Sequence, residues 1–202
     1  MKILLIDDHK LFSLSIQMIL KQNTEIEKID IMSDIKDLEN INTAQYDIYL
    51  IDINLNNISE ETGLELAEKL IKKDNSICIA ILTGHLKLMY EEKASKIGAK
   101  GFIDKNIEPE ELIKILKLIY AGGKYFKNIE TKEFFYDKLT PAEIKILSLT
   151  RKGKSIDEIT KEVYISKRTV FNHLNNIYSK LEVNNKQEAV YKAEQLGYFF
   201  DF

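Results

Sequence analysis

Short apolar runs alternate with helical patterns over the first 122 residues of this 202-residue chain. Runs rich in β-branched and aromatic residues predict buried strands, and they lie at 2–6, 27–31, 46–51, 77–82 and 100–103. Apolar residues at helical spacing follow each run, at 10–22, 34–42, 62–73, 86–97 and 109–121. Strands joined by helices in this way form a parallel sheet with helices on both faces. The alternation therefore predicts a doubly wound, five-stranded parallel α/β domain over residues 1–122.

The spacing also predicts which side of two helices packs on the sheet. In segment 10–22 the repeating apolar residues are Leu11, Leu14, Met18 and Ile19. In segment 109–121 they are Leu112, Ile113, Leu116, Ile119 and Tyr120. Residues at this spacing share one face of a helix, so we expect both sets to be buried. Asp34 is an expected N-cap of the segment 34–42.

The second part of the chain is organised differently. Residues 123–138 follow no single period and are predicted to be a linker. Its aromatic residues are expected to dock on a neighbouring domain, and they are Phe126, Phe134, Phe135 and Tyr136. From residue 139 onward only helical patterns occur, with Thr140 and Ser166 as candidate N-caps and a further helix starting near Ser155. These features predict a separate all-α domain over residues 139–202.

Composition and charge limit the class of protein. Hydrophobic residues make up 45% of the chain and charged residues 30%, which is typical of globular proteins with a real core. No apolar run approaches the ~18 residues that a membrane span needs, and no signal-peptide pattern is visible. A single cysteine, Cys78, lies in an apolar run, favours a buried thiol and suits a reducing compartment. We therefore expect a cytoplasmic protein without a membrane partner.

The net charge of −3 is unevenly divided. Residues 139–202 hold 10 Lys and Arg against 8 Asp and Glu, whereas residues 1–138 hold 19 against 24. The difference in sign favours different partners for the two parts. A net charge of +2 is nevertheless far below the basic excess of a strong nucleic-acid-binding domain.

Acidic residues follow two of the predicted strands. Asp52 ends the run 46–51, and Asp7 and Asp8 follow the run 2–6. The carboxyl ends of parallel strands meet at one edge of a sheet, which is where ligands bind in open α/β folds. Carboxylates brought together there repel one another unless a cation lies among them, so the pattern favours a metal pocket of oxygen ligands. The alternative is that Asp52 only caps the helix that follows.

Residues 1–122 resemble the receiver domain of two-component response regulators, which has a flavodoxin-like fold. The resemblance is carried by Asp7-Asp8, Asp52, Thr83 and Lys105, which stand at the ends of four predicted strands. It implies that Asp52 accepts a phosphoryl group from a cognate sensor histidine kinase. It also implies an Mg²⁺ site, consistent with the oxygen ligands that this ion prefers.

The same resemblance assigns roles to the other residues. Asp8 would bind Mg²⁺ directly, Asp7 mostly through water, and Asn54 through its backbone carbonyl. Lys105 would pair with the phosphoryl group, and Thr83 would donate its hydroxyl to it. The movement of Thr83 would be coupled to the aromatic residue three positions before the lysine, which is Phe102. The alternative for Phe102 is a plain core aromatic.

The chain departs from the family pattern after Asp52. Receivers usually have proline four residues later and glycine eight residues later, but here position 56 is Asn and the next glycine is Gly63. The loop 54–62 is therefore about three residues longer than usual, a change that costs little stability. It would alter partner docking or the lifetime of the phosphoryl group, or it is a neutral insertion.

Residues 139–198 resemble the LuxR-type helix-turn-helix domain of the NarL/FixJ class. The matching residues are Leu139-Thr140-Pro141-Ala142-Glu143, Gly153-Lys154-Ser155, Glu158-Ile159, Ile165-Ser166, Thr169-Val170, His173, Ile177, Lys180-Leu181 and Val183. The third helix would enter the major groove of DNA, where Arg reads guanine and Asn reads adenine. Base contacts are expected from Arg168, Phe171, Asn172 and Asn175, and phosphate contacts from Ser166, Lys167, Thr169 and Lys186. The alternative is a merely solvated polar face.

Two features of this part bear on assembly. Phe171 stands where the family usually has Lys, so it would touch a thymine methyl group or fold back onto the protein. The last helix, with Val190, Ala193 and Leu196, resembles a dimerisation helix, although the same face would also serve the domain's own core. We expect modest affinity of a monomer and an active homodimer on double-stranded DNA.

The sequence thus predicts a phosphorylation-controlled transcription regulator and no enzyme, beyond slow self-dephosphorylation at most. The first alternative is a phosphorylation-independent DNA-binding regulator that uses the receiver only for dimerisation. The second is a phosphotransferase or hydrolase, but related hydrolases have a second Asp two residues after the nucleophile, and here that residue is Asn54. No Gly-rich phosphate loop is present either.

Overall fold

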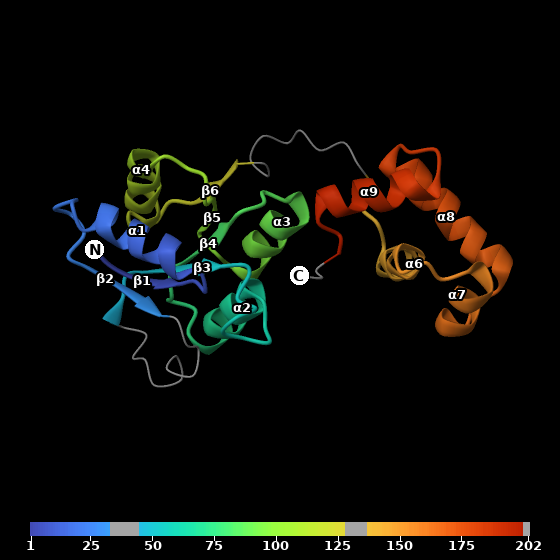
Figure 1. Ribbon diagram of the computed structural model, residues 1–202, viewed down its shortest axis with the longest axis horizontal. Coiled ribbons are helices and arrows are strands. Elements are labelled where there is room, and N and C mark those ends of the chain that lie inside the picture. Colours follow the sequence, from blue (N-terminus) through green and yellow to red (C-terminus); the bar gives the residue numbers. More distant parts are fainter. Residues whose placement is uncertain (33–44, 128–136, 200–202) are drawn as a thin grey trace. The chain divides into compact units, whose positions relative to one another are not determined.

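A parallel sheet of six strands lies at the centre of the first of two units in the computed structural model (Figure 1). The structure describes residues 1–32, 45–127 and 137–199, and the two units divide between Thr131 and Lys132. The strand order is β2-β1-β3-β4-β5-β6. The strands are β1 (Lys2–Ile6), β2 (Lys28–Met32), β3 (Ile48–Asp52), β4 (Ile79–Thr83), β5 (Gly101–Asp104) and β6 (Tyr125–Phe126). The doubly wound parallel sheet predicted from the sequence is confirmed.

The two faces of this sheet are covered by different helices. Helices α1 (Lys10–Leu20) and α4 (Pro109–Tyr120) cover one face, and α2 (Gly63–Lys73) and α3 (Leu88–Ile97) cover the other (Figure 1). Each strand contributes alternate residues to the two apolar cores, as the period of a strand requires. In β3, Leu50 packs beneath α1 and α4, whereas Ile51 packs on the α2 and α3 side.

The predicted faces of two helices are partly wrong. Leu11, Leu14 and Met18 of α1 are exposed, and the helix instead buries Ser13 and Leu20. This helix carries apolar residues on both sides, so their spacing alone does not decide which side meets the sheet. In α4, Leu112, Leu116 and Ile119 are buried as predicted and Ile113 is half-buried, but Tyr120 is exposed and Ile115 takes its place in the core. The helix predicted at 34–42, with its Asp34 cap, lies outside the described residues.

The sheet has one strand more than the five predicted. β6 lies within the predicted linker and pairs in parallel with β5, so that Phe126 stands beside Phe102. A two-residue strand has too short an alternation to be recognised from its own sequence. Phe126 is buried against the α2 and α3 side of the sheet, which confirms that it docks on a domain. Phe134, Phe135 and Tyr136 lie outside the described residues.

The second unit consists of four described helices. They are α6 (Pro141–Arg151), α7 (Ile156–Val163), α8 (Lys167–Leu181) and α9 (Lys186–Leu196). Two begin at the N-caps expected from the sequence, Thr140 and Ser166, and α7 begins at Ser155, near which a helix start was expected. Each of these three side chains accepts a hydrogen bond from the backbone three residues later. The all-helical prediction is confirmed. None of the described helices of either unit meets the length and apolarity that a membrane crossing requires.

Candidate functional site

Polar residues from four strands meet at the carboxyl edge of the sheet. Parallel register sets Asp52 beside Leu82, and Thr83 beside Asp104, so the residues that follow these strands share one edge. The Lys105 ammonium donates a hydrogen bond of 2.6 Å to Oδ2 of Asp52 and lies 2.8 Å from Oδ2 of Asp7. The helix that follows Asp52 is capped by Thr62, not by Asp52, so the capping alternative is wrong.

The charges of this edge are not balanced by protein groups alone. Burial raises the pKa of Asp52, while the hydrogen bond and charge of Lys105 oppose that rise and the neighbouring Asp7 adds to it. Oδ2 of Asp7 and Oδ1 of Asp8 are buried and accept no hydrogen bond from the described residues. Buried carboxylate oxygens of this kind are hard ligands suited to a small divalent cation. The residues present therefore fit a Mg²⁺ ion.

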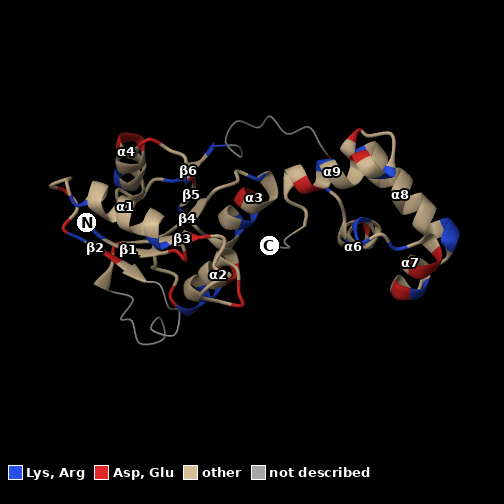
Figure 2. Cartoon of the chain, in the orientation of Figure 1, with Lys and Arg blue, Asp and Glu red and all other residues tan. Residues whose placement is uncertain are grey.

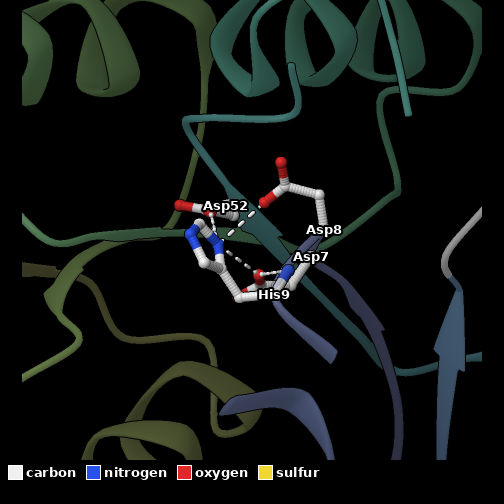
Figure 3. Close-up of side chains that lie close together, drawn as sticks. All are labelled: Asp7, Asp8, His9 and Asp52. Carbon is white, nitrogen blue, oxygen red and sulfur yellow. Dashed lines mark hydrogen bonds and ion pairs between the residues drawn. The ribbon is translucent and has the colours of Figure 1, made fainter. Parts of the chain in front are cut away.

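His9 belongs to the same cluster (Figure 3). Its Nδ1 lies 2.7 Å from Oδ1 of Asp8, 3.2 Å from Oδ1 of Asp7 and 3.6 Å from Oδ2 of Asp52. The sequence reasoning missed this residue, although its position directly after the acidic pair was a usable signal. His9 is the N-cap residue of α1 and makes no side-chain cap, so its ring is available to the acids.

Thr83 and Phe102 adjoin the acidic edge in different ways. The Thr83 hydroxyl donates to the backbone oxygen of His85 at 2.9 Å and accepts from the backbone nitrogen of His85 at 3.0 Å. The hydroxyl is thus engaged by its own loop, and the described residues give it no bond to Asp52. Phe102 is fully buried in the core on the α2 and α3 side. Asn54 is half-buried, and its backbone hydrogen bond to Asp52 lowers the pKa of that carboxyl.

Helix α8 presents two distinct sides. Its apolar residues are buried as expected from their spacing, and they are Val170, Leu174, Ile177 and Leu181. The predicted base-contacting residues are all exposed, and they are Arg168, Phe171, Asn172 and Asn175. Phe171 is 52% exposed, so it does not fold back fully onto the protein. Lys and Arg lie where this helix begins (Figure 2).

Three of the four expected phosphate-contacting residues lie at the beginning of this helix. The Ser166 hydroxyl accepts from the Thr169 backbone nitrogen at 3.1 Å and lies 2.8 Å from the Thr169 hydroxyl. Lys167 forms an ion pair of 2.5 Å with Asp157 of α7. Lys186 is exposed at the start of α9. These groups are accessible, and two of them also stabilise the helix terminus.

Comparisons with known proteins agree with this arrangement. The family model for the response regulator receiver domain matches residues 3–117, and the model for bacterial regulatory proteins of the luxR family matches residues 137–193. The chain is 29% identical to the transcriptional regulatory protein DegU of Brevibacillus brevis, over 98% of this chain and 94% of DegU. It is 34% identical to the transcriptional regulatory protein DesR of Bacillus subtilis, over 79% of this chain and 78% of DesR.

Solved structures of similar fold include the response regulator RcsB of Salmonella typhimurium. It aligns with a TM-score of 0.73 at 20% identity, over 96% of this chain and 99% of that chain. A structure of RcsB in complex with DNA aligns with a TM-score of 0.68 at 20% identity, over 97% of this chain and 98% of that chain. The chain therefore belongs to the two-component response regulators of the NarL/FixJ class, DNA-binding regulators that join a receiver domain to a LuxR-type helix-turn-helix domain.

Proposed function

We propose that phosphorylation of Asp52 by a sensor histidine kinase controls DNA binding by this protein. The observation that carries the proposal is the buried Asp52 carboxylate, held 2.6 Å from the Lys105 ammonium beside the buried carboxylate oxygens of Asp7 and Asp8. A carboxylate nucleophile next to a cation and a compact ammonium group suits phosphoryl transfer. We assign the receiver to residues 1–122, with strand β6 of the linker 123–138 completing its sheet, and the DNA-binding domain to residues 139–202.

In the transfer step an oxygen of Asp52 forms a bond to phosphorus as the bond from phosphorus to the kinase histidine breaks. The nucleophile must be ionised, and the hydrogen bond from Lys105 favours that form against the cost of burial. Asp7, Asp8, Asp52 and the Asn54 carbonyl would hold Mg²⁺. When bound, Mg²⁺ supplies positive charge that offsets the phosphoryl oxygens.

The response to phosphorylation would begin at Thr83 and Lys105. Lys105 contacts both Asp7 and Asp52, so it can follow a phosphoryl oxygen without leaving the site. The Thr83 hydroxyl would exchange its bond to the His85 backbone oxygen for one to the phosphoryl group. The fully buried Phe102 has no hydroxyl and would respond only by repacking.

The DNA-binding side of the proposal rests on α8. Its exposed Arg168, Asn172 and Asn175 carry the hydrogen-bonding groups that read base edges in the major groove. The low positive charge of residues 139–202 supports binding as a homodimer, because two copies double the phosphate contacts. We place the protein in the cytoplasm, where its kinase partner would transfer the phosphoryl group.

The test replaces Asp52 by Asn in the full-length protein. After incubation with acetyl phosphate and Mg²⁺, the wild type should gain the mass of one phosphoryl group and bind DNA selected from a random pool more tightly. D52N should show neither change, because an amide is a poor nucleophile. D104N is the matched control, since Asp104 lies at the same edge beside Lys105 and should leave phosphorylation intact.

Two results would contradict the proposal. Phosphorylation of D52N at the wild-type rate would remove Asp52 as the acceptor. Phosphorylation of the wild type without any change in dimerisation or DNA affinity would favour a phosphorylation-independent regulator.

A further inference from the structure

The long loop after β3 is folded back over the acidic edge. Leu55, at its start, is fully buried and anchors the loop in the core. The Leu55 backbone oxygen accepts hydrogen bonds of 2.8 Å from the backbone nitrogens of both Ile58 and Ser59. This turn brings Asn57, which directly precedes Ile58, to Asp8 on the neighbouring strand end.

Asn57 binds one oxygen of Asp8 with two donors. Its side-chain nitrogen donates to Oδ2 of Asp8 at 2.8 Å, and its backbone nitrogen donates to the same oxygen at 3.2 Å. The other oxygen, Oδ1, is buried and accepts no hydrogen bond from the described residues. It points toward His9 and Asp52, whereas Oδ2 points away from them (Figure 3).

We propose that Asn57 is a positioning residue of the divalent-cation site, which fixes the Asp8 carboxylate so that Oδ1 is directed at the ion. The inference rests on the proposed function, in which Asp8 is a cation ligand. Asp8 lies among other acids that repel it, and a carboxylate held by a single bond would rotate away from them. Two donors on its outer oxygen oppose that rotation and restrict the ligand before the ion arrives.

The inference also assigns a role to the long loop 54–62, which carries Asn57 to Asp8. The loop makes the turn at Leu55 that returns the chain toward β1, and the bond from Asn57 to Asp8 spans 49 residues of sequence. Asn57 is itself exposed, so its amide contributes little to any core, and its hydrogen bonds to the described residues are those to Asp8. Both donors of Asn57 bind the outer oxygen of the carboxylate that we assign to the cation, which favours a role in the site over a neutral insertion.

The test measures cation binding directly in the full-length protein, without any phosphodonor. Mg²⁺ and Mn²⁺ are titrated by calorimetry into the wild type and N57A. Loss of a residue that orients a metal ligand typically weakens affinity 10- to 100-fold, and we expect at least about a tenfold loss for both ions. N56A is the matched control, because Asn56 is the neighbouring exposed asparagine of the same loop, and it should bind as the wild type does.

A second measurement separates positioning from general damage. With acetyl phosphate in excess, N57A should need about ten times more Mg²⁺ for half-maximal phosphorylation, while its rate at saturating Mg²⁺ should match the wild type. Thermal unfolding without metal should be unchanged.

Wild-type cation affinity in N57A would overturn the inference if D8N abolishes binding. If D8N also binds the cations with wild-type affinity, Asp8 is not a cation ligand and the inference fails with its premise. Neither result bears on whether Asp52 accepts the phosphoryl group, since D52N tests that separately.

Discussion

Gly63 occupies the point where the long loop returns to the strand that carries Asp52. Its backbone nitrogen donates to the Ile53 oxygen at 2.8 Å. A Cβ atom at this position would lie 1.8 Å from the Asp52 backbone oxygen and 2.7 Å from the Asp52 carbonyl carbon. Both are backbone atoms, so they cannot move aside as a flexible side chain would. A glycine is therefore required here even though the insertion has moved it away from its usual place in the family.

Replacing Gly63 by Ala should destabilise the protein by about 3 kcal/mol, because the end of β3 or the start of α2 must shift to admit a methyl group. It should also slow phosphorylation, since that shift moves Asp52. Urea unfolding and the rate of reaction with acetyl phosphate measure the two effects. G84A is the control, because a Cβ at Gly84 meets nothing within 4 Å, and its stability should stay within about 0.5 kcal/mol of the wild type. Equal stability of the two variants would contradict this account.

Some site residues could be predicted from the sequence, and others could not. Asp52 and Lys105 end strands of one parallel sheet, so strand patterns alone bring them to the same edge. Asn57 reaches Asp8 through a turn in an irregular loop, where no periodicity reports which residue will face the pocket. His9 depends on the direction of its ring, which the bare sequence does not specify.

At the scale of elements, local chemistry determines where a helix begins, but it does not determine which side of the helix is buried. The Thr140 side chain caps α6, and the Thr140 backbone nitrogen donates a hydrogen bond to the Glu143 carboxylate, all within four residues of sequence. The buried side of α1, by contrast, is chosen by packing on the sheet, which outweighs the spacing of Leu11, Leu14 and Met18. Helix starts can be predicted from the sequence because a capping residue and its hydrogen-bond partner are close neighbours in the sequence.

Glu143 joins this capping box to the core of the helical unit. Its side chain is 3% exposed, and its Oε2 lies 2.8 Å from the Lys180 ammonium of α8. Burial by itself would raise the pKa of Glu143, but the hydrogen bonds from Lys180 and Thr140 together outweigh it, and the pKa lies below its usual value. The ionised form is thus favoured by folding.

We expect E143Q to destabilise the helical unit by about 2–3 kcal/mol at neutral pH, because it leaves Lys180 without its charged partner. A depressed pKa stabilises the fold above the unfolded glutamate value of about 4.3, and that stability is lost as pH falls through the folded pKa. Urea unfolding should therefore show that the free energies of unfolding of the wild type and E143Q become more similar as the pH falls.

The matched control for this prediction is E158Q. Glu158 forms the equivalent capping box with Ser155 at the start of α7, but it is exposed and lies 3.8 Å from Lys154. Its replacement should cost less than about 1 kcal/mol. If E158Q lowers the free energy of unfolding as much as E143Q does, then the burial of Glu143 and its ion pair with Lys180 contribute nothing beyond the cap.

At the scale of the whole molecule, the acidic edge of the sheet and the exposed polar side of α8 belong to different units of the chain. The presence of an α/β unit and a helical unit follows from the change of periodicity along the chain, so the fold class of each unit could be predicted from the sequence. The two surfaces carry different groups, with carboxylates at the edge of the sheet and exposed amides and a guanidinium on α8. A substitution on α8 should consequently change DNA binding without changing phosphorylation.

R168A should leave phosphorylation by acetyl phosphate unchanged and weaken binding to selected DNA by about 1–3 kcal/mol, with relaxed preference at one base position. Arg168 is exposed on α8 and has no part in the acidic edge. Electrophoretic mobility shifts at a fixed salt concentration measure the affinity. K145A, an exposed change on α6, removes the same charge and should have little effect. Equal losses in both variants would indicate that Arg168 acts only through charge.

The short strand β6 sets the C-terminal boundary at which this receiver can be separated from the rest of the chain. An excision at Gly122 would remove Tyr125 and Phe126, strip the last strand from the sheet and leave the β5 edge unpaired. An unpaired edge invites strand pairing between molecules, and the fully buried Phe102 would lose its neighbour on that side. Chimeric regulators that graft this receiver onto another output domain should accordingly be joined after residue 127, with the first residues of the connecting segment kept as part of the sheet.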